Sequence, residues 1–228
     1  IVTAAITHAT PAAFIAHVDD RKKEEEIATF FLNGTIDFFA GAGQHFFDKR
    51  SDNRNLIQEL KQQDFSIFTK EQTFNASNTK SKIGWFIPDS GCNDSLRKPF
   101  LAEALKTSLT HVSKNQQGFF IMVEGSQIDW AGHENNTRCL LQQMNEFEEA
   151  IRVALDFAKK NKNTLVIVTA DHETGGLTII DGNPTTGQLN LHFSTTNHTA
   201  QNVGIFAWGL GASYFTGYME NTDLFKKM

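Results

Sequence analysis

The most informative segment of the sequence is an apolar run that ends in acidic and histidine side chains. The run 119–123 is followed by Glu124 and Gly125, and then by Asp129 and His133, which lie four residues apart. If a helix begins near Asp129, these two side chains share one face and can bind a single zinc ion. The alternative is a helix-capping aspartate beside a surface histidine, because short motifs produce many chance matches.

A second apolar run ends in the same way. Residues 164–169 lead into Asp171 and His172, and Gly175 and Gly176 then allow the backbone to turn closely. An ordinary reading is a polar loop with a capping aspartate. A position after a strand makes a ligand pair more attractive, because ligands of α/β sheets bind beyond the carboxyl ends of the strands.

Two further segments are weak when taken alone. His198 lies in a polar stretch, where an isolated histidine is usually a surface residue. Near the start of the chain, His8 and Thr10 follow a predicted strand, and Arg21 could form a bidentate fork on a phosphate. The alternative is that Thr10 is a simple N-cap and Arg21 belongs to a solvated charged run, residues 19–26.

The four segments are more specific together than apart. They supply three carboxylates, four imidazoles and one arginine, each after or near a predicted strand. Such a mixed set suits two or three divalent ions that clamp a phosphoryl group. The sequence has no Cys-x-x-Cys spacing, and its two cysteines, Cys92 and Cys139, could form one disulfide or remain two buried thiols.

The elements that would position these residues alternate between strands and helices. This order predicts an α/β fold, a three-layer α/β/α sandwich with a largely parallel sheet. We expect helices from Thr10 to about His17, over 101–112 with one apolar face, and after Glu134, where apolar residues step by three and four from Leu140 through Met144 to Ala158. The expected strands are 1–6, 35–39, 65–68, 82–87, 119–123, 164–169 and 203–207.

Length and composition exclude several classes of protein. The chain has 228 residues, 40% hydrophobic, with a net charge of −5, which is typical of a folded globular protein and favours one α/β domain over 1–228. No apolar stretch approaches the length of about 20 residues that a transmembrane helix needs. The acidic balance and the absence of a basic block argue against a nucleic-acid partner.

These motifs resemble those of the alkaline phosphatase family. The segments Val123–His133 and Val168–Gly176 are similar to its two most specific signatures, and Thr7–Ala12 and His198–Thr199 follow in the expected order. The resemblance implies a phosphomonoesterase with two zinc sites and one magnesium site, which acts through a phosphoserine intermediate.

The resemblance also implies a role for each residue. Asp129, His133 and His198 resemble the ligands of the first zinc, and Asp171 and His172 resemble ligands of a second zinc site that is incomplete here.

Four residues near the beginning of the chain and after the run 119–123 resemble the rest of the site. Thr10 and Glu124 resemble magnesium ligands with His8 beside them, and Arg21 resembles the arginine that holds the substrate phosphate.

One departure from the family concerns the nucleophile. The family's serine and a bridging aspartate lie upstream of the Thr-His-Ala-Thr segment, and the six residues before Thr7 contain neither. We do not take Ser126 as a substitute. The chain is therefore expected to be the carboxyl-terminal portion of an alkaline phosphatase and to be inactive alone. Alternatives are a phosphodiesterase or phosphomutase of the same superfamily, or a non-catalytic metal- or phosphate-binding module. By resemblance, the protein is periplasmic or secreted and forms a homodimer.

Overall fold

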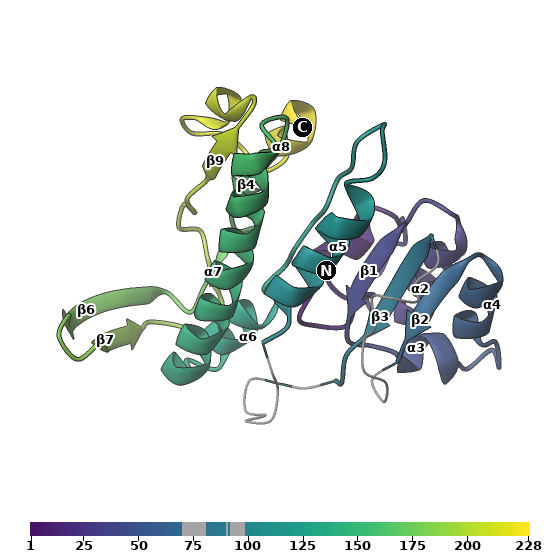
Figure 1. Ribbon diagram of the computed structural model, residues 1–228. Coiled ribbons are helices and arrows are strands. Elements are labelled where there is room, and N and C mark those ends of the chain that lie inside the picture. Colours follow the sequence, from purple (N-terminus) through teal and green to yellow (C-terminus); the bar gives the residue numbers. More distant parts are fainter. Residues whose placement is uncertain (70–80, 90, 92–98) are drawn as a thin grey trace. The chain divides into compact units, whose positions relative to one another are not determined.

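The computed structural model describes residues 1–69, 81–89, 91 and 99–228 (Figure 1). Within it the chain forms two compact units, unit 1 over Ile1–Gln127 and unit 2 over Ile128–Met228. The single domain over 1–228 therefore stays a prediction, and each unit is described by itself. Cys92 lies outside the described residues, whereas Cys139 is buried.

Unit 1 is an α/β unit built on a three-stranded sheet. Its described elements are α1 (Thr10–Ala13), α2 (Glu24–Thr29), η1 (Phe30–Leu32), β1 (Phe38–Gly41), α3 (His45–Asp48), α4 (Leu56–Gln62), β2 (Phe65–Phe68), β3 (Lys82–Phe86) and α5 (Leu101–Val112). The strand order is β1-β3-β2, and both pairs are parallel, as the sequence predicts. The helix over 101–112 is confirmed, whereas α1 ends four residues before the expected His17.

The backbone near the start of the chain extends this sheet without forming a regular strand. Val2 and Ala5 make parallel bridges to Glu124 and Ala42, so residues 1–6 lie between β1 and the end of the run 119–124. The predicted strands 1–6 and 119–123 are therefore wrong as regular strands. The pairing nevertheless places Glu124 and the residues after 6 at the carboxyl edge of the sheet, where ligands of α/β sheets bind.

Phenylalanines fill the core of unit 1. Phe47, Phe65 and Phe86 are almost completely buried, and Phe39 lies within 5.5–6.1 Å of all three rings, measured between ring centroids. Aromatic rings in such stacked and tilted arrangements contribute packing energy beyond the area they bury. This core fixes the strands whose ends carry the polar residues.

Unit 2 contains a long helix and three small antiparallel sheets. Its elements are α6 (Gln127–His133, which begins at the last residue of unit 1), α7 (Thr137–Lys160), β4 (Leu165–Val168), β5 (Glu173–Thr174), β6 (Leu177–Asn183), β7 (Gln188–Phe193), β8 (His198–Thr199), β9 (Phe206–Gly209), η3 (Ala212–Phe215) and α8 (Asp223–Lys227). The described pairs are β4 with β9, β5 with β8, and β6 with β7. The predicted strand 164–169 is confirmed as β4, and 203–207 only overlaps β9.

Helix α7 follows the predicted pattern only in part. Asn136 caps it by accepting a hydrogen bond from the Cys139 amide at 3.1 Å. Two lysines in its last turn interact favourably with the negative, carboxyl-terminal end of the helix dipole. Leu140 and Ala158 are buried as expected, but Met144 is 48% exposed, so its place on the buried face was wrong. The buried positions include the polar Gln143, because the face that packs is rotated from the apolar stripe. In the described ranges, no helix has the length and apolar character needed to cross a bilayer.

Candidate metal centre

Helix α6 brings the first two predicted ligands together. Asp129 and His133 lie one turn apart on it, and the distance between Asp129 Oδ1 and His133 Nε2 is 3.4 Å. The predicted helix near Asp129 is thus confirmed. Gly132 lets the helix approach β5 closely, because a Cβ atom there would lie 2.9 Å from both Cβ and the carbonyl oxygen of Thr174.

The short strand pair β5–β8 positions the third predicted ligand, His198. In the register of this antiparallel pair, Thr174 lies opposite His198. The turn before β6 runs through Gly175 and Gly176, whose φ angles of 95° and 58° are left-handed and favour glycine. His198 Nε2 thereby reaches a position 3.3 Å from Asp129 Oδ1 and 3.1 Å from His133 Nε2.

These three atoms form what we call the ligand triangle: Asp129 Oδ1, His133 Nε2 and His198 Nε2. Its sides measure 3.4, 3.3 and 3.1 Å. Zinc binds nitrogen and oxygen ligands at about 2.0–2.1 Å in a tetrahedron, whose edges are therefore about 3.3–3.4 Å. The triangle has the size of one face of that tetrahedron, so the donor set and its spacing both fit zinc.

Hydrogen bonding prepares His133 for a metal. Its Nδ1 lies 2.7 Å from the carbonyl oxygen of Thr196, which can only accept a hydrogen bond. The ring proton therefore sits on Nδ1, and the lone pair of Nε2 points into the triangle. A backbone carbonyl is one of the common partners for the second ring nitrogen of a metal-bound imidazole.

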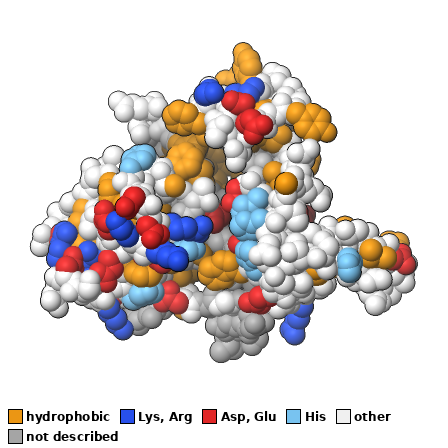
Figure 2. Space-filling model, turned by 180° about the vertical axis from the view of Figure 1, so that it is seen from behind, with side chains coloured by type: hydrophobic (Ala, Val, Ile, Leu, Met, Phe, Trp, Pro, Cys, Tyr) orange, Lys and Arg blue, Asp and Glu red, His pale blue; other side chains and the backbone are white. Residues whose placement is uncertain are grey.

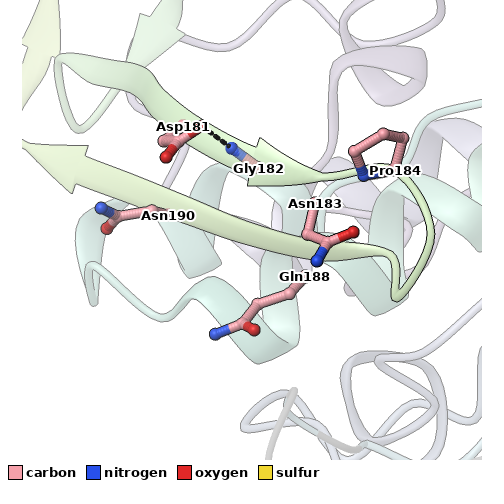
Figure 3. Close-up of a pocket in the computed structure, with 6 residues that line it drawn as sticks. All are labelled: Asp181, Gly182, Asn183, Pro184, Gln188 and Asn190. Carbon is pink, nitrogen blue, oxygen red and sulfur yellow. Dashed lines mark hydrogen bonds between the residues drawn. The ribbon is translucent and has the colours of Figure 1, made fainter.

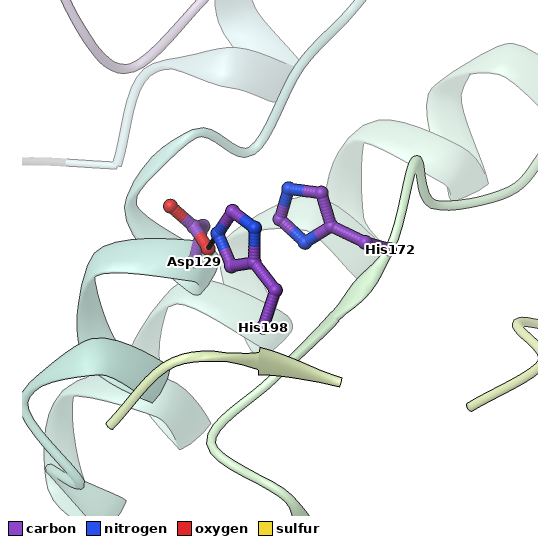
Figure 4. A group of neighbouring side chains, drawn as sticks. All are labelled: Asp129, His172 and His198. Atoms are coloured by element: carbon purple, nitrogen blue, oxygen red, sulfur yellow. Dashed lines mark ion pairs between the residues drawn. The ribbon is translucent and has the colours of Figure 1, made fainter. Parts of the chain in front are cut away.

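Asp171 and His172 lie beside the triangle. One nitrogen of His172, Asp129 and His198 each offer an atom within 4.8 Å of the others, and Figure 4 shows these three side chains pointing toward one another. The His172 ring stacks on that of His198 with centroids 3.6 Å apart. Asp171 is the most exposed member, and its Oδ2 lies 3.2 Å from His172 Nε2. The five residues predicted as zinc ligands thus gather in unit 2.

The cluster is open to solvent. The side chains of Asp129, His133 and His198 are 34%, 39% and 48% exposed, which leaves room for a ligand to approach. In the space-filling view, histidine and acidic side chains lie next to one another at the surface (Figure 2).

Sequence reasoning missed two residues that support the cluster. Thr174 donates from Oγ1 to Asp129 Oδ1 at 2.5 Å, and the same oxygen lies 3.2 Å from His172 Nδ1. Glu173 accepts hydrogen bonds from the amides of Gly176 and Leu177 and from the Thr199 hydroxyl. They are the two residues after His172, and their position inside the ligand motif is the only signal the sequence offers.

The hydrogen bonds that Glu173 accepts beside the cluster depend on its carboxylate being ionised, so they are sensitive to acid. Burial raises the pKa of Glu173, but the hydrogen bonds from Thr199, Leu177 and Gly176 outweigh it and hold this pKa below the ordinary value of 4.5. A carboxyl group whose pKa is lower in the folded state stabilises the fold above its unfolded pKa. That stabilisation is lost as the pH falls through the folded value.

We therefore expect Glu173→Gln to lower the free energy of unfolding at neutral pH. The difference in this free energy between wild type and variant should shrink progressively below pH 4.5. Urea unfolding at a series of pH values measures this difference, with Glu220→Gln at an exposed position as the control. A difference between wild type and Glu173→Gln that stays constant from pH 7 to pH 3 would contradict the assignment.

The remaining predicted residues lie in unit 1. The Thr10 amide donates to Glu124 Oε2 at 2.7 Å, so the two proposed magnesium ligands are in contact. Thr10 is the first residue of α1, and Ala9 is the N-cap, so the alternative of Thr10 as a simple N-cap is wrong. His8 and Arg21 are also in contact, through His8 Nε2 and Arg21 Nη2 at 2.7 Å. The structure thus pairs Thr10 with Glu124 and His8 with Arg21.

A shallow pocket on the β6–β7 hairpin is a poor alternative site. It is lined by Asp181, Gly182, Asn183, Pro184, Gln188 and Asn190 (Figure 3). One carboxylate among amide side chains, with no histidine, does not provide the donor set that the predicted chemistry needs.

The chain thus combines an α/β fold with a cluster of carboxylate and imidazole groups, which is the kind of ligand set that binds divalent metal ions. The family model for alkaline phosphatase matches residues 1–192, and the chain belongs to the alkaline phosphatase family. It is 38% identical to alkaline phosphatase 4 of Bacillus subtilis over 202 residues, which cover 84% of this chain and 42% of that protein. It is 34% identical to the repressible alkaline phosphatase of Saccharomyces cerevisiae, over 78% of this chain and 38% of the relative. The chain therefore spans about two fifths of these relatives.

Solved structures agree on the fold. The alkaline phosphatase of the Antarctic bacterium TAB5 matches 99% of this chain and 68% of its own, with a TM-score of 0.89 and 41% identity. A variant of that enzyme, solved with magnesium bound in a site named M3, has the same TM-score and 40% identity, over 99% of this chain and 69% of its own. The predicted alkaline-phosphatase-like α/β fold is confirmed.

Proposed function

We propose that this chain is the metal- and phosphate-binding part of an enzyme that hydrolyses phosphate monoesters. The ligand triangle carries the proposal, because its three sides match a tetrahedral zinc face and His133 already holds its proton away from it. Family membership supports the reaction class, and the relatives are named as phosphatases.

The proposed zinc ligands divide into a stronger and a weaker set. Asp129, His133 and His198 supply three ligands and leave a fourth position open, as in catalytic zinc sites. Asp171 and His172 supply only two, so a second zinc binds them more weakly. Bound zinc would act as a Lewis acid that stabilises the charge of the transferring phosphoryl group.

Unit 1 supplies the proposed magnesium ligands and the phosphate-binding residue. Glu124 and Thr10 offer oxygen atoms, which magnesium prefers, and magnesium commonly keeps several water ligands beside one or two carboxylates. Both hydrogen bonds that Arg21 makes within the described part of the chain come from Nη2, so Nη1 and Nε remain for phosphate oxygens.

We also propose that the 228 residues are inactive alone. Ser126 is no substitute nucleophile, because it is only 8% exposed and a phosphate ester cannot reach it. The resemblance further supports a periplasmic or secreted location and a homodimer.

The test is turnover by the full-length protein. We expect hydrolysis of p-nitrophenyl phosphate, much slower hydrolysis of the bis-p-nitrophenyl diester, complete loss of activity in chelator, and recovery with zinc plus magnesium. The 228-residue chain, assayed in parallel, should show none of this activity. Full turnover by a metal-free sample would contradict the metal mechanism, and preferential diester hydrolysis would point to a phosphodiesterase.

A further inference from the structure

The contacts of Arg21 indicate which ring nitrogen of a neighbouring histidine accepts a hydrogen bond. Arg21 Nη2 lies 2.7 Å from His8 Nε2 and donates to the His8 carbonyl oxygen at 3.4 Å. A guanidinium group can only donate hydrogen bonds, so His8 Nε2 has to accept one. In this contact the lone pair of His8 Nε2 faces Arg21, which leaves Nδ1 as the nitrogen that carries the ring proton.

Glu24 faces the nitrogen that carries this proton. Its Oε1 lies 3.7 Å from His8 Nδ1, and its Oε2 accepts a hydrogen bond from the Thr7 hydroxyl at 2.9 Å. Thr7 is 1% exposed and the Glu24 side chain 19% exposed, so the carboxylate is held against a buried anchor. A negative oxygen opposite Nδ1 favours a proton on that nitrogen.

The two neighbouring glutamates have other partners. Glu25 accepts hydrogen bonds from the amide and hydroxyl of Ser51, and Glu26 lies 3.9 Å from Lys23 Nζ at the surface. The charged run 19–26 is therefore not uniformly a solvated surface, and only Glu24 among these three contacts His8.

We propose that Glu24 is a positioning residue, which holds His8 as the Nδ1–H tautomer so that His8 Nε2 fixes the guanidinium of Arg21. With Nη2 engaged by His8, the remaining edge of Arg21 is oriented for an anionic phosphate oxygen. This inference rests on the proposed phosphate-binding role of Arg21 and adds a residue that acts through His8.

The first measurement is the tautomer of His8 in the full-length protein. Long-range proton–nitrogen NMR spectra of protein labelled with ¹⁵N-histidine separate the Nδ1–H and Nε2–H forms, and His8→Gln assigns the signal. We expect the Nδ1–H form in the unaltered protein and in Glu26→Ala, the matched control. In Glu24→Ala we expect the Nε2–H form to appear, and Glu24→Gln, which keeps an acceptor oxygen, should restore part of the Nδ1–H signal.

The second measurement is the affinity for inorganic phosphate by titration calorimetry. Glu24→Ala should raise the dissociation constant about tenfold, the equivalent of one net hydrogen bond, and Glu26→Ala should leave it unchanged. An Nε2–H form in the unaltered protein, or an unchanged tautomer and affinity in Glu24→Ala, would overturn the proposal. A changed tautomer in Glu24→Ala together with unchanged phosphate affinity in Arg21→Ala would support the Glu24–His8 contact and overturn the phosphate role of Arg21.

Discussion

Replacing Asp129 by alanine should weaken binding of the first zinc equivalent by at least about 100-fold, since loss of a partner behind a ligand already costs 10–100-fold. The reason is geometric. Asp129 Oδ1 is a corner of the ligand triangle and its only carboxylate, so its removal leaves two imidazoles and no negative charge. Competition with a chromophoric chelator measures the affinity in the full-length protein.

The matched control for this substitution is Asp181→Ala, which removes an exposed carboxylate from the β6–β7 hairpin in the same unit. It should leave zinc affinity unchanged. Because the Asp129 side chain is one-third exposed, we expect Asp129→Ala to retain its fold, which circular dichroism checks. Equal zinc affinity in the Asp129 and Asp181 variants would remove Asp129 from the proposed site.

Replacing Arg21 by alanine should raise KM for a phosphate monoester about 10- to 100-fold, the range expected for a lost charge-assisted hydrogen bond. The change in kcat should be smaller, because the proposed role of Arg21 is to bind and orient the phosphate, which contributes to ground-state binding. Steady-state kinetics of the full-length enzyme separate the two constants.

Arg21→Lys provides the graded comparison, since lysine keeps the charge but loses the planar fork. Its KM should lie between those of the wild type and Arg21→Ala. If both variants keep the wild-type KM and kcat, Arg21 has no part in binding the substrate.

The predictable part of the site follows from local rules. The four-residue step from Asp129 to His133 required only a helix, and the helix is present. The apolar run before Asp171 likewise predicted β4 and a polar turn after it. Such features depend on residues near one another in the sequence, which is why pattern reasoning finds them.

The unpredictable part depends on pairing between distant segments. The sequence offers only weak evidence that His198 is a ligand, because its position depends on the register of β8 against β5. That pairing involves only two residues on each strand. The Thr174 hydroxyl contacts Asp129, 45 residues away, and no periodicity reports that contact. The sequence of residues 1–6 predicts a strand, but their backbone pairs like a strand at only two positions, so no regular strand forms.

Long-range contacts also decided which charged residues matter in unit 1. Glu24 is one of three consecutive glutamates, and the sequence does not distinguish them. The anchor at Thr7 and the ring of His8 make the distinction, through contacts that exist only in the folded chain.

The central claim is that Asp129, His133 and His198 form one face of a zinc tetrahedron. X-ray absorption at the zinc edge, on full-length protein loaded with one zinc equivalent, tests it most directly. We predict nitrogen and oxygen ligands at about 2.0–2.1 Å, with two imidazoles in the wild type and one fewer in His198→Ala. A first shell without imidazole, or the same two-imidazole shell in His198→Ala, would contradict the account.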